Sequence, residues 1–179
     1  MKGVVFVSFA DFIEETWGLD FWDEALNQVK PASQGIYTTV STYPDQELLD
    51  LVSFICDAKS IPLEDALRAF GKWLFVRLHG MAPPQTQEFS EPFVFLRGVQ
   101  DVIHVEVKKL NEDAILPEFK FLKETENQLT LEYISPRRLS SFCEGLIIGM
   151  GEFIGQPLTV DREESGEGDD WRCILTVNK

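Results

Sequence analysis

The sequence is poor in the two residue types that most often ligate metals or form catalytic pairs. Its 179 residues include only two histidines, His79 and His104, and three cysteines, Cys56, Cys143 and Cys173. An odd number of cysteines without paired spacing predicts no disulfide framework and is typical of a reducing compartment. Two histidines leave little room for a hydrolytic triad, so any histidine chemistry depends on one or both of them.

Basic residues are also scarce. The chain has 16 Lys and Arg against 30 Asp and Glu, a formal net charge of −14. This balance argues against nucleic acid and against an anionic membrane surface as partners. No apolar run approaches the roughly 20 residues that span a bilayer. The apolar start at residues 1–7 is soon interrupted by acidic residues, without a cleavage site for a signal peptide. We therefore predict a cytoplasmic protein.

The short motifs of common enzyme classes are missing as well. The sequence contains no Gly-rich phosphate loop with lysine, no His-Glu-x-x-His, no Cys-x-x-Cys and no nucleophile elbow. We therefore predict that the protein is not an enzyme.

Apolar residues recur at three- and four-residue intervals through the first two-thirds of the chain, the period of an amphipathic helix. Loops rich in Pro, Gly and Ser separate the periodic stretches at residues 31–43 and 81–92. We expect Asp45 to cap the second helix and Pro62 to open the third. The predicted helices cover residues 19–29, 46–59, 62–78 and 95–110.

The final third alternates polar and apolar residues, as strands do. Two hairpins are predicted, with strands at residues 119–124, 129–134, 158–162 and 171–177. Between the hairpins, Ser135 and Pro136 resemble a helix start, and Gly155 ends the helix. The predicted class is α+β: a helical N-terminal part, then a C-terminal antiparallel sheet of two hairpins with an intervening helix.

The two histidines have different surroundings. His79 precedes Gly80 and a Pro-rich loop, and we interpret it as an exposed histidine at a helix terminus. His104 lies among branched apolar residues, yet on a helix it falls outside the main apolar stripe. Two interpretations of His104 stay open: an exposed or hydrogen-bonded histidine, and a neutral imidazole that ligates a metal or heme iron.

A second group of polar residues is Tyr133, Ser135 and Arg137. On an extended segment, residues two apart face the same way. One phenol, one hydroxyl and one guanidinium together suit a buried carboxylate or phosphate, because Arg binds it bidentately and the hydroxyls fill the remaining lone pairs. The alternative is a strand end and helix cap with incidental polar residues.

Three segments together resemble the H-NOX (heme nitric oxide/oxygen binding) family: residues 1–3 (MKG), 101–104 (DVIH) and 133–137 (YISPR). The order of the predicted elements extends the resemblance over essentially the whole chain. It implies a single heme-binding domain over 1–179, with a helical subdomain at about 1–60 and a heme-ligating and sheet part at about 61–179. The heme would be buried between them.

The resemblance also assigns roles to individual residues. It implies heme b (iron protoporphyrin IX) as the cofactor, with His104 as the proximal iron ligand. Tyr133, Ser135 and Arg137 would bind the heme propionates, and Pro117 would press on the heme and distort it from planarity. Apolar residues would line the heme pocket: Val5, Phe9, Leu74, Phe75, Leu78, Phe142 and Leu146.

The function implied by the family is ferrous gas sensing. Some members carry a tyrosine at the position matching Phe142, and its hydroxyl donates a hydrogen bond to bound oxygen. Phe142 therefore predicts binding of NO and CO but poor binding of O2. The family also implies that NO releases His104 and lets the heme relax. The signal would pass in trans to a histidine kinase or to a diguanylate cyclase or phosphodiesterase.

Three alternatives remain: an NO or CO carrier without signalling, a heme-free interaction domain that kept the fold, and an enzyme such as a heme peroxidase. The intact set of His104, Tyr133, Ser135 and Arg137 speaks against the second. A zinc site, which some family members build from cysteines, is not expected. Cys143 and Cys173 have no further cysteine or histidine nearby in the sequence, and structural zinc usually needs four ligands.

Overall fold

The computed structural model describes residues 1–87 and 89–179, and it divides into two compact units, Met1–Phe70 and Gly71–Lys179. The division falls within the long helix α4 (Leu63–Met81), whose first turns belong to the first unit and whose later turns belong to the second.

The first unit is helical. It contains α1 (Gly3–Trp17), α2 (Leu19–Val29), α3 (Asp45–Lys59) and the start of α4. Its buried core is rich in aromatic and branched residues, including Phe6, Phe9, Ile13, Trp22, Leu51, Ile55 and Phe70. The predicted bounds of α2 are confirmed.

The start of α3 differs from the prediction. Asp45 does not cap the helix but is its first residue, and Pro44 takes the cap position. The Asp45 carboxylate instead accepts a hydrogen bond from the N-terminal amine of Met1 at 2.5 Å. The charged amine of Met1 and the backbone N–H groups of the helix are alternative donors to this carboxylate. The hydrogen bond from the charged amine is the stronger of the two, because it is charge-assisted.

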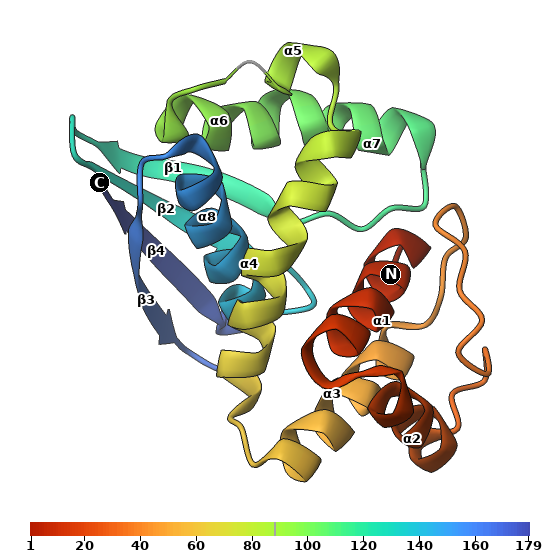
Figure 1. Cartoon of the computed structure of the whole chain (residues 1–179). Coiled ribbons are helices and arrows are strands. Elements are labelled where there is room, and N and C mark those ends of the chain that lie inside the picture. The colour runs from red at the N-terminus through yellow and green to blue at the C-terminus, as the bar shows by residue number, and fades with distance from the viewer. Residues whose placement is uncertain (88) are drawn as a thin grey trace. The chain divides into compact units, whose positions relative to one another are not determined.

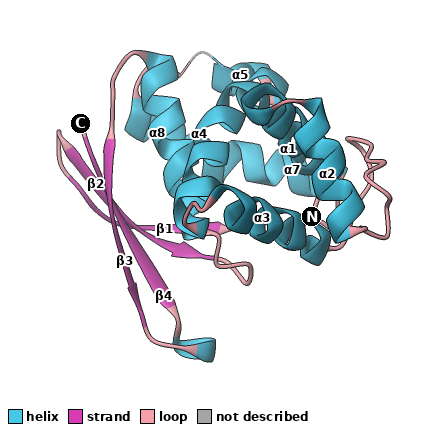
Figure 2. Ribbon diagram, turned by 60° about the horizontal axis from the view of Figure 1, so that its bottom comes forward, coloured by secondary structure: helices cyan, strands magenta, loops and turns pink. Residues whose placement is uncertain are grey.

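The second unit combines a sheet with helices. Its strands are β1 (Glu118–Glu124), β2 (Gln128–Ile134), β3 (Thr159–Ser165) and β4 (Arg172–Asn178), all antiparallel in the order β1-β2-β4-β3. Helix α8 (Ser140–Ile154) lies across one face of this sheet (Figures 1 and 2). The α+β class and the helix between two hairpins are thereby confirmed.

Buried and more exposed residues alternate along the central strands β2 and β4, and the buried ones form the core of the second unit. Leu129, Leu131 and Tyr133 of β2 are buried, as are Cys173, Leu175 and Val177 of β4. They pack with Ile147 and Met150 of α8 in one apolar cluster. Residues between them face the other side and are more exposed, which is the pattern of an antiparallel sheet covered on one face only.

The helical run before the sheet is less regular than predicted. The single helix expected at 95–110 is three consecutive pieces: α6 (Pro92–Gly98), a π-helix η1 (Val99–Ile103) and α7 (His104–Leu110). The loop expected at 81–92 contains a short helix, α5 (Pro84–Gln87). Glu88, which belongs to the same predicted loop, is not among the described residues. A short 3-10 turn, η2 (Gly168–Asp170), precedes β4.

The predicted start of α8 is wrong. The helix begins at Ser140, and residues 136–137 form a turn before it, with Arg138 in the left-handed region at φ 50°. Ser-Pro also favours the first positions of a turn, and here that preference decides the structure. The predicted end is confirmed, because Gly155 closes α8 at φ 78°.

Helices α4 and α8 cross with their backbones nearly in contact. A Cβ placed on Gly71 would lie 2.2 Å from the carbonyl oxygen of Phe142, and one on Gly149 would lie 2.5 Å from that of Lys72. Glycine is required at both positions because any larger residue would push the helices apart. None of the helices in the described part of the chain is long and apolar enough to cross a membrane.

Candidate functional site

His104 is the first residue of α7 and follows directly on the π-helix. Its ring is mostly buried, with its centroid 5.7 Å from that of Phe119. Its Nδ1 atom is buried and has no hydrogen-bond partner among the described residues. His104 is therefore not exposed, and its Nδ1 lacks the hydrogen bond that one interpretation of the sequence expected.

The protonation of His104 follows from this burial. Removal from water disfavours the charged imidazolium and lowers the pKa of His104 to about 4. At neutral pH the imidazole is uncharged and its nitrogen lone pair is available. A buried polar atom without a partner is costly, so a nitrogen left in this state points to a bound group that would satisfy it.

Tyr133 is linked to this histidine through the ring of Phe119. It is 4% exposed at the end of β2, and its ring centroid lies 6.3 Å from that of Phe119, which in turn contacts His104. Burial raises the pKa of the Tyr133 phenol, which therefore stays protonated. The ring of Phe119 thus joins the predicted histidine and the predicted tyrosine in one cluster.

Ser135 and Arg137 follow Tyr133 but do not continue the strand. Ser135 is buried, and its Oγ accepts a hydrogen bond from the backbone N–H of Arg137 at 3.2 Å. Arg137 is half-buried, and its guanidinium donates to the carbonyl of Ile115 at 2.5 Å. The expected extended arrangement of all three residues is therefore wrong beyond Ser135. The turn directs Arg137 toward the segment that contains Pro117, itself half-buried.

The apolar residues predicted for a pocket lie in both units. Leu74 and Phe75 of α4 are buried, and Leu78 is half-buried. Phe142 and Leu146 of α8 are half-buried, and the backbone of both approaches Gly71 of α4. Val5 and Phe9 belong to α1 in the first unit, where Phe9 is buried and Val5 half-buried.

His79, the other histidine, is not exposed as predicted. It is half-buried on α4, with its ring centroid 4.5 Å from that of Phe153 and 5.8 Å from those of Phe75 and Phe95. Its role is packing within an aromatic group.

All three cysteines are free and buried. Burial raises the pKa of Cys173 to about 11 and raises that of Cys143 further. Both groups are protonated thiols at neutral pH, and protonated thiols are weak nucleophiles and weak ligands.

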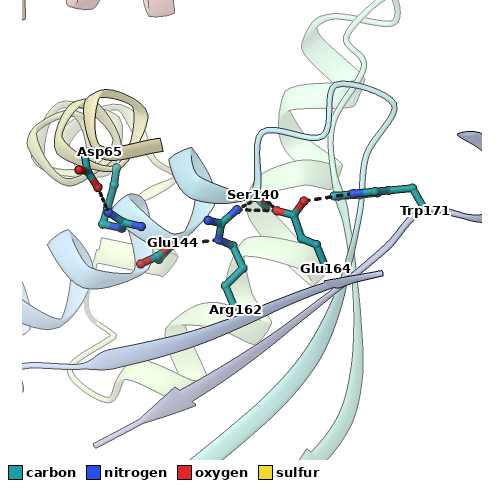
Figure 3. Close-up of polar contacts among 7 residues, drawn as sticks. Asp65, Ser140, Glu144, Arg162, Glu164 and Trp171 are labelled. Atoms are coloured by element: carbon teal, nitrogen blue, oxygen red, sulfur yellow. Dashed lines mark hydrogen bonds and ion pairs between the residues drawn. The ribbon is translucent and has the colours of Figure 1, made fainter. Parts of the chain in front are cut away.

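A polar network that the sequence did not suggest anchors α8 to the β3–β4 hairpin (Figure 3). Arg162 of β3 forms ion pairs with Glu144 of α8 at 3.3 Å and with Glu164 at 2.5 Å, and donates to Ser140 at 3.0 Å. Glu164 also accepts hydrogen bonds from Ser140 and from the indole of Trp171. Two of these residues, Ser140 and Glu144, flank Phe142 on α8, so the network fixes the turn that carries Phe142.

Replacing Arg162 with methionine is expected to destabilise the protein by about 3 kcal/mol, because it removes a cation that is ion-paired with the buried carboxylate of Glu144. The Arg162 side chain is 15% exposed and that of Glu144 is 9% exposed. Urea unfolding measures the change. The matched control is Lys109→Met, which removes the exposed pair with Glu106 and should cost less than about 1 kcal/mol. Equal effects of the two substitutions would contradict a structural role for the Arg162 network.

These donors fit a heme. A neutral imidazole nitrogen without a partner is suited to bind iron, and the phenol of Tyr133 in β2 and the hydroxyl and guanidinium that follow the strand are suited to carboxylates. No cluster of three or more His, Cys, Asp or Glu side chains that could hold a bare metal ion occurs among the residues described.

Comparison with known proteins identifies the family of this chain. The model of the Haem-NO-binding family matches residues 2–162. The chain therefore belongs to the Haem-NO-binding, or H-NOX, family. A comparison with curated proteins finds no match.

Solved H-NOX structures share the whole fold. The H-NOX protein from S. oneidensis in the Fe(II)NO state is 29% identical, with a TM-score of 0.89 over 99% of this chain and 98% of that one. The unliganded Fe(II) protein from K. algicida is 28% identical, with a TM-score of 0.85 over 100% and 97%. The IWP-051-bound H-NOX from Shewanella woodyi in the Fe(II)CO state is 35% identical, with a TM-score of 0.83 over 100% and 94%. Two of these three structures are of Fe(II) states with NO or CO as the ligand, and the third is an unliganded Fe(II) state.

Proposed function

We propose that this protein is a ferrous heme b sensor of NO and CO, with His104 as the proximal ligand of the iron. The observation that carries the proposal is the buried, unpartnered Nδ1 atom of a histidine whose pKa is held at about 4. The relatives in Fe(II)NO and Fe(II)CO states support the same cofactor and gases.

Each polar residue has a distinct task in this proposal. When bound, the heme supplies a ferrous iron that takes a diatomic gas. His104 gives the iron a neutral nitrogen ligand, which its burial keeps deprotonated at neutral pH. Tyr133, Ser135 and Arg137 would hold the propionates, because a phenol, a hydroxyl and a guanidinium together suit carboxylates. Pro117 would contact the bound heme and influence its shape.

The gas selectivity follows from the apolar lining. Phe142 and Leu146 offer no hydrogen-bond donor to a gas bound on the iron, and Leu74, Phe75 and Leu78 add none. Bound oxygen gains strongly from a buried donor, whereas NO depends on it much less. The protein should therefore discriminate against O2.

Replacing Phe142 with tyrosine is expected to stabilise the oxygen complex. A buried phenol donor is worth about 1–2 kcal/mol, so O2 affinity should rise by roughly 5- to 30-fold. Oxygen titration of the reduced protein measures this, with Phe153→Tyr as the control because Phe153 is 48% exposed on the same helix. The apolar-pocket account fails if both variants bind O2 as weakly as the unchanged protein.

The absorption spectrum of the reduced protein tests the proposed cofactor and gases. We expect a Soret band that moves on addition of NO or CO and stays unchanged in air. No Soret band after heme reconstitution would leave a heme-free interaction domain that kept the fold. A stable new band in air would contradict the selectivity.

We further propose that gas binding is signalled in trans, to a histidine kinase or to a diguanylate cyclase or phosphodiesterase. A sensor needs two states that differ beyond the gas site, whereas a carrier does not. Amide hydrogen exchange measured with and without NO distinguishes a sensor from a carrier. Changes spreading from α7 along β1 and into α8 indicate a sensor, and changes confined to pocket residues indicate a carrier.

A further inference from the structure

One side chain in the π-helix makes a contact that the proposed function leaves unused. The amide oxygen of Gln100 accepts a hydrogen bond from the backbone N–H of Phe119 at 2.9 Å. Phe119 lies near the start of β1, the edge strand of the described sheet. Edge strands carry backbone groups that have no neighbouring strand to pair with, and here a side chain 19 residues away supplies the partner.

The same phenylalanine also contacts His104. Gln100 and His104 lie four residues apart, about one helical turn, and both are directed at Phe119. Gln100 holds the backbone of Phe119, and the ring of Phe119 packs 5.7 Å from the His104 ring. The position of His104 relative to β1 is therefore set by a polar contact and an aromatic contact together.

The segment between α7 and β1 is held at both ends. Arg137 donates to the carbonyl of Ile115 at 2.5 Å, and the N–H of Phe119 donates to Gln100 at 2.9 Å. Pro117 lies midway between these two anchors. Just before them, Lys108 of α7 donates to the carbonyl of Ala114 at 2.8 Å. Pro117 is thereby positioned by side chains rather than by regular backbone pairing.

From this geometry we infer that Gln100 is a positioning residue that ties the helix of His104 to the segment of Pro117. The inference rests on the proposed function, in which His104 binds the iron and Pro117 limits the shape of the heme. With Gln100 in place, a displacement of His104 draws the start of β1 with it. Pro117 then moves with the ligand instead of staying behind.

The position of Gln100 in the π-helix strengthens this inference. A π-helix is rare and occurs mostly as a single turn inside an α-helix, often at functional sites. Here the backbone N–H of His104 bonds to the carbonyl of Val99, five residues earlier. The wider turn contains Gln100 and ends where the histidine begins, so the irregularity and the anchor occupy the same turn.

The test compares Gln100→Leu and Gln100→Glu in the reduced, heme-loaded protein. Leucine has no acceptor, whereas glutamate keeps one for the Phe119 N–H. The first readout is amide exchange of Phe119, which should quicken by roughly 5- to 10-fold in the leucine variant because one hydrogen bond is lost. The second is the iron–histidine stretching band in the resonance Raman spectrum, which should shift in the leucine variant and return toward its original frequency in the glutamate variant.

The experiment includes a control, Gln128→Leu, and a second variant, Gln100→Asn, in case the first does not fold. Gln128→Leu removes another glutamine side-chain hydrogen bond, to Asn178 at 2.9 Å, and should leave the Raman band unmoved. If Gln100→Leu does not fold, Gln100→Asn takes its place, since the shorter amide cannot reach Phe119. Faster Phe119 exchange with an unchanged Raman band would overturn the inference and leave a purely structural hydrogen bond. The absence of any iron–histidine band in the unchanged protein would instead refute the proposed ligand.

Discussion

Replacing His104 with glycine is expected to weaken heme affinity by more than about 100-fold, because even residues that only support a metal ligand contribute 10- to 100-fold. The variant loses the one buried imidazole nitrogen that has no partner among the described residues. It also leaves a space beside Phe119 that added imidazole can fill. Heme titration followed by the Soret band measures the affinity, and imidazole should restore most of it.

His79 provides the matched control for this experiment, since the chain has no third histidine. His79→Phe keeps an aromatic ring among Phe75, Phe95 and Phe153, so the fold should tolerate it. This variant should bind heme as the unchanged protein does. If His79→Phe lost heme and His104→Gly retained it, the iron ligand would be His79, and our assignment of His104 would be wrong.

The second large effect is expected at the crossing of α4 and α8. Gly71→Ala places a methyl group 2.2 Å from the carbonyl oxygen of Phe142, and a backbone atom cannot rotate away. We expect a loss of about 3 kcal/mol, or roughly 6–12 °C in Tm for a chain of this size. The displaced turn of α8 carries Phe142, so the CO spectrum should change as well.

Gly80→Ala is the control for this substitution. Gly80 lies on the same helix, and no described atom is within 4 Å of its added methyl group. Alanine is the better helix former, so this variant should gain up to about 1 kcal/mol. The expected changes in stability have opposite signs in Gly71→Ala and Gly80→Ala, which distinguishes a steric clash from a general effect of replacing glycine in a helix. Thermal unfolding showing equal changes for both variants would contradict the close crossing.

Local patterns were sufficient to predict most of the fold. Three- and four-residue periodicity located α2, α3 and α4, and alternation located all four strands, because each pattern reflects burial of one face. The π-helix was not predictable in this way. It changes the spacing of backbone hydrogen bonds by a single residue while the apolar residues around it keep a helical period. The start of α8 was predicted wrongly for another reason, because a Ser-Pro pair such as Ser135-Pro136 occurs both in turns and at helix starts.

The site was only partly predictable. The family resemblance selected His104, Tyr133, Ser135 and Arg137, but the residues alone left the state of His104 open. Burial decides that state, and burial depends on packing against Phe119. Gln100 and Arg162 gave no signal in the sequence. Their partners are 19 and 18 residues away, at separations fixed by strand and helix packing rather than by any local period.

The central claim is that the His104 imidazole binds the heme iron, and isotope labelling tests it most directly. The His79→Phe protein, grown with ¹⁵N-histidine, carries the label only at His104. Resonance Raman of the reduced protein should then show an iron–ligand stretching band that moves to lower frequency than in the unlabelled sample. A band that is unaffected by the label, or no such band in heme-loaded protein, would contradict the assignment of His104.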